Sequence, residues 1–372
     1  MFSLDSRTYP EWADLPIELS AVIANHVTSI YDYISFRGVC KSWRSAATFD
    51  NFDRAFPRLP GLMYVTKEQK EENWKKENRC LRSYHVPNIV NFLDVSMNKT
   101  YKISDFPPTA ERRYVSCRGW ILSVWGVDVH LTHPVWRIRI ELPTTNTFSS
   151  LINTSHSHDG NGISISKMVL SDSPTLKVDL VVMVIWGGDN QLGFSRPGDS
   201  SWTVIAASDD EKFSDIIYHN GRLYALDVNR RIVECDIHGP NPTQIRQVFS
   251  LPSYDPDFSM VARRCTWYLV ETSGKFLIVA RHFGTSRCRI FELDLKGGIH
   301  KEVDDLGNKA LFLGCNSSLC VELSTWNEIK PNCIYFSDVN VYCLSDKGFH
   351  RFVYRSAAGS IPAPATWVMP SF

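Results

Sequence analysis

The chain has 372 residues and a mass of 42.4 kDa, which suits two domains, or one small module and one large one. Apolar residues make up 44% of the chain and charged residues 22%, as in an ordinary folded protein. The 40 Lys and Arg residues balance the 40 Asp and Glu residues, and this zero net charge argues against a nucleic-acid-binding protein.

Residues 1–11 form an N-terminal tail without the apolar stretch of a secretory signal. The longest apolar run, Leu180 to Trp186, is far shorter than the ~20 residues that a membrane-spanning helix needs. We therefore expect a protein of the cytoplasm, the nucleus or both, with no membrane partner. In that setting the ten cysteines, none of them in a C-x-x-C pair, are expected to be reduced and buried.

Residues 12–56 have the pattern of a small helical module. Leu15-Pro16 opens a first helix, in which Leu19, Val22 and Ile23 fall on one apolar face together with residues 27 and 30. A second short helix is predicted over 32–37 with its end at Gly38, and a third over 39–47. Three short helices cannot bury all of these faces among themselves, so we expect an apolar surface that meets a partner. The alternative is that the helices dock on the larger domain.

Residues 57–85 are predicted to be a charged connecting helix. Nine of the thirteen residues from Lys67 to Arg79 are charged, and Glu71–Lys75 is a favourable pair one helical turn apart. Such a segment acts either as a spacer between two modules or as a merely solvated surface.

Residues 86–372 contain short β-like runs separated by turns. In residues 213–236 two strands flank Asn220-Gly221, a strong hairpin signal because a type I′ turn needs positive φ at both central residues. The scheme recurs at 267–294. Gly221 lies 53 residues before Gly274 and 102 residues after Gly119, so the spacing suggests a repeat.

A repeat of this length with three or four strands per unit predicts an all-β propeller of about six blades. In a closed ring the first and last units must meet, so the early hairpin at 92–103 is expected to share a blade with strands near 341–369. A β-sandwich would explain the strands but not the period.

Few residues form a pattern that is typical of a catalytic or metal-binding site. The sequence lacks the common nucleophile, metalloprotease, phosphate-loop and dinucleotide motifs, and no catalytic residue, cofactor site or metal site is predicted. His156, His158 and Asp159 are close together but lie in a loop-like stretch, and zinc needs four well-placed ligands. Cys315 and Cys320 flank a predicted turn and are interpreted as core side chains.

The first region resembles an F-box. This resemblance rests on two motifs, W-x-x-LP-x-EL at 12–19 and VCKSWR at 39–44. The remainder is similar to the C-terminal domain of unknown function in plant F-box proteins, which has kelch-like propeller character. The matching pieces include DIIYHNGRLYALD, CRIFELDL, LFLGCNSSLCVE and WVMPS. Kelch repeats proper carry a double glycine in each blade, whereas this chain has only Gly187-Gly188 and Gly297-Gly298.

The resemblance implies a non-catalytic substrate receptor of an SCF ubiquitin ligase. The F-box would bind a Skp adaptor, which links it to a cullin and a RING subunit, and the propeller would bind an unknown protein target. The residues expected at the adaptor contact are Leu15, Pro16, Leu19, Ile23, Val39, Cys40, Trp43 and Arg44. Two alternatives remain open: an F-box protein that acts outside the ligase as a binding module, and a propeller enzyme or glycan binder.

Overall fold

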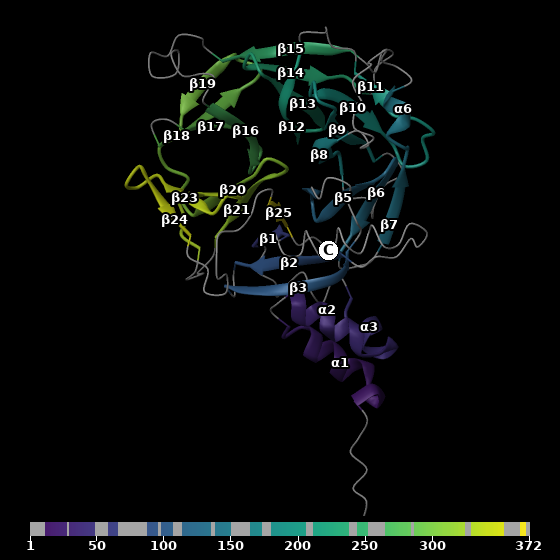
Figure 1. Cartoon of the computed structure of the whole chain (residues 1–372). Helices are drawn as coiled ribbons and strands as arrows, with labels where there is room; N and C mark the ends of the chain where they lie inside the picture. Colours follow the sequence, from purple (N-terminus) through teal and green to yellow (C-terminus); the bar gives the residue numbers. More distant parts are fainter. Residues whose placement is uncertain are drawn as a thin grey trace, which may run out of the picture. The chain divides into compact units, whose positions relative to one another are not determined.

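The structure is a computed structural model of the chain, shown in Figure 1. The chain forms two compact units, one within residues 1–58 and the other within residues 59–371. The structure describes residues 12–27, 30–48, 59–65, 88–95, 98–106, 114–134, 138–149, 164–172, 180–205, 211–237, 244–251, 265–283, 286–323, 329–352 and 365–369. The charge run at 67–79 and the cluster at 156–159 lie outside these ranges.

The first unit is helical. A short 3-10 turn, η1 (Trp12–Asp14), precedes α1 (Ile17–Ala24), α2 (Ile30–Val39) and α3 (Lys41–Ala46). Pro16 is the N-cap of α1, and its carbonyl accepts the first helical hydrogen bond from Ser20 N–H at 3.0 Å. Pro suits this place because its missing N–H would have no helical partner.

The second helix differs from the prediction that it ends at Gly38. It runs through Gly38 to Val39. The break comes instead at Cys40, whose backbone is extended (φ −159°, ψ 176°) and whose Sγ accepts a hydrogen bond from Trp43 N–H at 3.5 Å. Val39 and Cys40, which were predicted to lie in the third helix, therefore end α2 and cap α3.

The second unit is a six-bladed propeller, as predicted (Figure 1). Six sheets surround one axis, each an antiparallel succession of strands except the sixth. The first three contain β25 (Thr366–Val368), β1 (Gly61–Tyr64), β2 (Asn88–Asp94) and β3 (Lys99–Phe106); β4 (Val115–Cys117), β5 (Trp120–Trp125), β6 (Asp128–His133) and β7 (Ile138–Leu142); and β8 (Ile165–Leu170), β9 (Val182–Trp186), β10 (Gln191–Ser195) and β11 (Thr203–Val204).

The other three sheets follow in chain order. They contain β12 (Phe213–His219), β13 (Arg222–Asp227), β14 (Arg231–Cys235) and β15 (Ile245–Ser250); β16 (Cys265–Thr272), β17 (Lys275–His282), β18 (Arg287–Asp294) and β19 (Ile299–Glu302); and β20 (Lys309–Leu313), β21 (Ser318–Glu322), β22 (Cys333–Phe336), β23 (Asn340–Cys343) and β24 (Gly348–Arg351). A short helix, α6 (Asn146–Ser149), follows the second sheet. One end strand of each sheet lies next to the axis of the ring. In the order of the sheets, these innermost strands are β25, β4, β8, β12, β16 and β21.

The two ends of the propeller chain close the ring. The C-terminal strand β25 pairs with β1, which pairs with β2, so Leu62 faces Trp367 on one side and Leu93 on the other. The predicted sharing of a blade between the early hairpin and a C-terminal strand is confirmed for β25. Strand β1 was not predicted: it lies inside 57–85, the range expected to be a connecting helix, so the propeller begins before residue 86.

The glycine spacing reflects equivalent turns. Gly119, Gly221 and Gly274 each follow a residue with positive φ in the turn between the first two strands of a blade. In the Asn220–Gly221 turn φ is 48° and 81°, as the predicted type I′ hairpin requires. The 102 residues between Gly119 and Gly221 correspond to two blades.

The sixth blade departs from a simple meander. Its order is β21-β20-β22-β23-β24, and β20 pairs with β22 in parallel. The turn predicted between Cys315 and Cys320 is present and joins β20 to β21. The inner position of β21 and the parallel pair were not predicted, because strand direction and the choice of neighbouring strand depend on contacts distant in the chain.

The core of the propeller lies between blades. Each of five hydrophobic clusters combines residues from two adjacent sheets; one, for example, joins Val169 and Phe194 of the third sheet to Phe213 and Val233 of the fourth. Trp120, Trp202 and Trp367 are almost completely buried. Trp186, which is also buried, belongs to the same interior.

Candidate functional site

The helical unit is held together by small side chains and a few aromatic contacts. Helix α1 buries Ser20 and Ala24, and the buried Ala46 and Ala47 end α3. The Tyr33 hydroxyl and the Arg37 guanidinium both donate to the carbonyl of Ala47, each at 2.8 Å. Because burial removes water from the phenol, it raises the pKa of Tyr33, against the lowering effect of Arg37.

Helix α1 exposes its large apolar side chains. Leu19, Val22 and Ile23 are 52%, 53% and 37% exposed, although they lie three and four residues apart on one helical face. Ser20 and Ala24 point to the opposite side, where small side chains permit close packing of α1 on the rest of the unit. The larger part of the apolar surface of this helix is therefore left for something outside the unit.

Further exposed apolar residues occur in the same unit. Trp12, Ile17 and Val39 are 68%, 47% and 52% exposed. Trp12 is held in place by its backbone, because its carbonyl accepts a hydrogen bond from Trp43 Nε1–H at 2.9 Å, and the two rings meet edge to face at 6.4 Å. We call Leu19, Val22, Ile23 and Val39 together with Trp12 and Ile17 the exposed apolar set of the helical unit.

The predicted adaptor residues are divided between this set and the interior. Leu19, Ile23 and Val39 belong to the exposed apolar set, and Pro16 and Arg44 are also exposed. Arg44 Nε donates to the carbonyl of Arg37 at 3.2 Å, so this guanidinium stabilises the end of α2. Leu15, Cys40 and Trp43 are half-buried, and Trp43 lies 4.5 Å from the ring of Phe36.

Three members of the exposed apolar set were not among the predicted contact residues: Trp12, Ile17 and Val22. The sequence held a signal for two of them, since Trp12 begins the motif and Val22 follows the periodicity of Leu19 and Ile23. The sequence did not show which residues of α1 face the interior. Packing decides this, and it selects Ser20 and Ala24.

The centre of the propeller carries buried polar groups. Lys167 of β8 is 4% exposed and forms an ion pair with the fully buried Asp215 of β12. Asp215 also accepts hydrogen bonds from the N–H groups of Ile216 (2.6 Å) and Leu269 (2.8 Å). Burial raises the pKa of Asp215, whereas the Lys167 ammonium and these two donors lower it. Sequence reasoning did not single out either residue.

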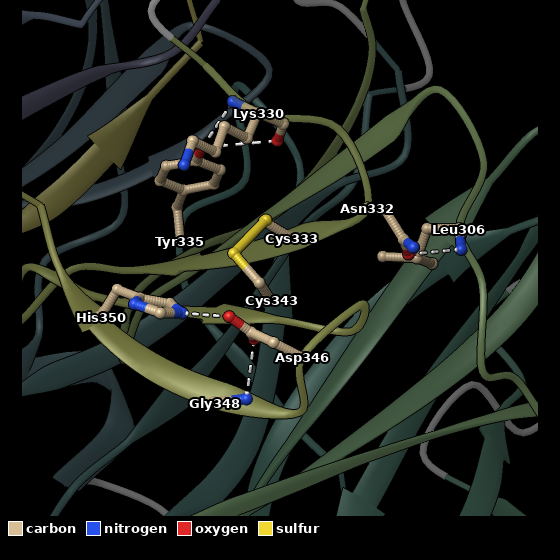
Figure 2. Close-up of a disulfide and its surroundings, with 9 residues drawn as sticks. All are labelled: Leu306, Lys330, Asn332, Cys333, Tyr335, Cys343, Asp346, Gly348 and His350. Atoms are coloured by element: carbon tan, nitrogen blue, oxygen red, sulfur yellow. Dashed lines mark hydrogen bonds and ion pairs between the residues drawn. A yellow bond between two sulfur atoms is a disulfide. The ribbon is translucent and has the colours of Figure 1, made fainter.

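Two of the cysteines depart from the expectation of reduced thiols. Cys333 of β22 and Cys343 of β23 lie directly opposite each other, with Cα atoms 4.2 Å apart, and form a disulfide (Figure 2). The pairing follows from strand register, which spacing alone does not reveal. Cys315 is also contrary to expectation, because it is exposed in the turn between β20 and β21. Cys320 is half-buried, and its Sγ donates to Thr272 Oγ1 at 3.0 Å.

The surroundings of the disulfide are held by ordinary turn contacts (Figure 2). Asp346 accepts hydrogen bonds from Gly348 N–H at 3.0 Å and from His350 Nε2 at 2.7 Å, which lowers the pKa of Asp346. Within the described ranges, no group of three His, Cys, Asp or Glu side chains could hold a metal ion. No helix of those ranges is both long and apolar enough to cross a membrane.

Comparisons with known proteins match both units. A family model described as F-box domain matches residues 12–55, and a model described as KIB1-4 beta-propeller matches residues 92–355. The F-box protein At2g26160 of Arabidopsis thaliana is 25% identical over 358 residues, covering 88% of this chain and 96% of that protein. The F-box/kelch-repeat protein KIB1 of the same plant is 27% identical over 269 residues, covering 70% of this chain and 61% of that protein.

Solved structures are more distant. The N-terminal domain of Nup159 aligns with a TM-score of 0.33 at 11% identity, over 58% of this chain and 56% of that one. No inference about function is drawn from a similarity of this size. The family models cover most of the chain in the order expected from its motifs. The chain therefore belongs to the F-box proteins with a KIB1-4 β-propeller.

Proposed function

We propose that the protein is the substrate-receptor subunit of an SCF-type ubiquitin ligase. The F-box unit binds a Skp adaptor, which joins it to a cullin and a RING subunit, and the propeller binds the protein to be ubiquitinated. The receptor itself is non-catalytic and works in the cytoplasm, the nucleus or both. Membership of the F-box family supports this role.

The observation that carries the proposal is the exposed apolar set of the helical unit. Burying apolar surface contributes about 25 cal/mol per Å², so large side chains left open on a small unit favour a protein partner. Leu19, Val22 and Ile23 form one continuous stripe, which suits contact with another protein better than isolated exposed residues would.

The test is the affinity of the full-length chain for a Skp adaptor, measured by calorimetry. Leu19→Ala combined with Ile23→Ala should weaken the complex at least tenfold, because truncating packed apolar side chains at an interface removes more than the ~1.4 kcal/mol that equals a factor of ten. The melting curve of the variant should match that of the unchanged protein, since both side chains are exposed.

A matched control is available on the propeller. Phe283 and Ile299 are 59% and 65% exposed, and Phe283→Ala with Ile299→Ala removes a similar amount of apolar surface from the other unit. This control should bind the adaptor as the unchanged chain does. Equal affinities for all three proteins would exclude α1 from the contact. Adaptor binding without a cullin in the purified complex would favour the alternative of an F-box protein that acts outside the ligase.

A further inference from the structure

The Cys333–Cys343 disulfide lies close to the outer edge of the sixth blade. Cys333 begins β22 and Cys343 ends β23, and the next strand outward, β24, is the last strand of the sheet. In an antiparallel sheet, residues that face each other across strands project to the same side. Gly348 of β24 faces Cys343, so the row that contains the disulfide ends in a residue without a side chain.

The Cys343 end of the disulfide is the more accessible one. Cys343 is 7% exposed and Cys333 2%. A Cβ atom on Gly348 would lie 3.3 Å from Asp346 Oδ1 and 3.6 Å from His350 Nε2, and these two side chains are each 53% exposed (Figure 2). Local opening of the short edge strand β24 is therefore enough to bring an external thiol to Cys343, without unfolding of the blade.

The two cysteines also belong to the part of the propeller where the ring closes. They lie in the apolar cluster that joins the sixth blade to the first, together with Leu62 of β1 and Trp367 of β25. Strands β1 and β25 pair with each other and so bring the two ends of the propeller chain together. A covalent bond between β22 and β23 restricts the conformations of the strands on one side of this cluster. Loss of that bond should therefore loosen the packing against β1 and β25.

The proposed ligase role places the chain in a compartment where thiols are kept reduced. Disulfides are rare in such a compartment, and those that form are usually transient and sense the redox state. A cysteine pair that strand register holds together and that is accessible at one sulfur suits thiol–disulfide exchange. This step of the argument rests on the proposed function, whereas the exchange itself is a property of the propeller.

We propose that Cys333 and Cys343 form a reversible redox site that exchanges with thiols and disulfides of the glutathione class and that tightens ring closure when it is oxidised. In reduction, a glutathione thiolate attacks Cys343 Sγ, the bond between the two cysteines breaks, and its electron pair leaves with Cys333 as a thiolate. A second glutathione thiolate then releases Cys343 and forms oxidised glutathione. The two cysteine thiolates take up the two protons that the glutathione thiols released, so the protein gains two electrons.

The test equilibrates the full-length chain in mixtures of reduced and oxidised glutathione. Free thiols are then trapped by alkylation and identified by peptide mass spectrometry. The Cys333–Cys343 pair should change from mostly reduced to mostly oxidised across the series. Its oxidised fraction should follow the ratio of oxidised glutathione to the square of reduced glutathione, as a two-electron exchange requires. The buried Cys235 is an internal control, because it is a free thiol and should stay reduced throughout.

Two measurements on the unchanged chain connect the redox state to ring closure. Reduction should lower the melting temperature by at least about 3 °C, because the open pair gives the unfolded chain more freedom. Reduction should also speed amide hydrogen exchange in β1 and β25. Strands β13 and β14 of the fourth blade share no apolar cluster with the disulfide and should exchange as before.

A variant tests the access through Cys343. Gly348→Val adds a side chain to the row of the disulfide and should slow reduction by glutathione at least about threefold, because the attacking thiolate must reach the sulfur. The matched control is Gly188→Val in the turn between β9 and β10, where an added Cβ would meet no atom within 4 Å. This control should be reduced at the rate of the unchanged chain.

Three results would overturn the proposal. If the pair stays oxidised in every glutathione mixture, the disulfide is a permanent structural link, and if it stays reduced in every mixture, there is no redox site. If the pair exchanges but neither the melting temperature nor hydrogen exchange in β1 and β25 changes, it does not act on ring closure. Equal reduction rates for Gly348→Val and the unchanged chain would exclude attack beside β24. All of these measurements are made without the adaptor, so their failure leaves the substrate-receptor proposal untouched.

Discussion

The two units treat apolar side chains in opposite ways. In the propeller, large apolar residues fill the spaces between blades, and those that are exposed, such as Val228, Phe283 and Ile299, are scattered. The much smaller helical unit contributes more exposed large apolar side chains than the propeller does among the described residues, and three of them form one stripe on α1.

The polar groups show the reverse pattern. The helical unit uses its buried polar contacts for backbone carbonyls, as Tyr33 and Arg37 do at Ala47. The propeller encloses a complete ion pair, Lys167–Asp215, at its centre. One unit thus exposes a stripe of apolar side chains, whereas the other encloses a pair of opposite charges at the centre of its ring.

The largest expected effect concerns the buried ion pair. Lys167→Met should destabilise the propeller by about 3–5 kcal/mol, because it leaves the Asp215 carboxylate buried without its cation. The double variant Lys167→Met with Asp215→Asn should recover much of this loss, since it removes the uncompensated charge. The free energy of unfolding of both variants is measured by urea unfolding followed by tryptophan fluorescence. If the free energy of unfolding of Lys167→Met lies within about 1 kcal/mol of that of the unchanged chain, the prediction is contradicted.

The same variant has a predictable pH dependence. Burial raises the pKa of Asp215, and Lys167 is the main group that lowers it. Without Lys167 the folded-state pKa should rise further above its unfolded value, so the folded state binds a proton more readily. The stability deficit of Lys167→Met should therefore shrink as the pH falls from the folded-state pKa toward the unfolded value.

A smaller effect separates the two faces of α1. Ala24→Leu should destabilise the helical unit by about 1–3 kcal/mol, because the buried side of α1 has room only for small side chains. Val22→Ser on the exposed side should change the stability by less than about 0.5 kcal/mol. Hydrogen exchange of residues 17–47 reports this unit separately from the propeller. Equal protection in both variants would show that α1 does not pack through Ala24.

The smallest effect is a difference in thiol reactivity. Burial raises the pKa of Cys235 and of Cys288 to about 12, so both thiols should resist alkylation near neutral pH, whereas the exposed Cys315 should react first. Cys333 and Cys343 should react only after reduction. Peptide mass spectrometry after timed alkylation gives the order. Rapid labelling of Cys343 without a reductant would mean that the disulfide is absent.

Sequence alone was sufficient for features with a local cause. The Asn220–Gly221 turn was predictable because positive φ restricts the residues that can form it. Equivalent glycines one or two blades apart revealed the repeat and hence the propeller. The F-box was recognised from the LP-x-EL and VCKSWR motifs, and the apolar periodicity of α1 predicted an exposed face.

Tertiary structure decided the features that join distant segments. Three features depend on strand register, which no short segment encodes. They are the position of β1 between β25 and β2, the parallel pair in the sixth blade, and the Cys333–Cys343 disulfide. The pairing of Lys167 with Asp215 is of the same kind: each residue alone is an ordinary charged side chain. They meet because the innermost strands of the third and fourth blades, β8 and β12, pack side by side, and burial then leaves each charge dependent on the other.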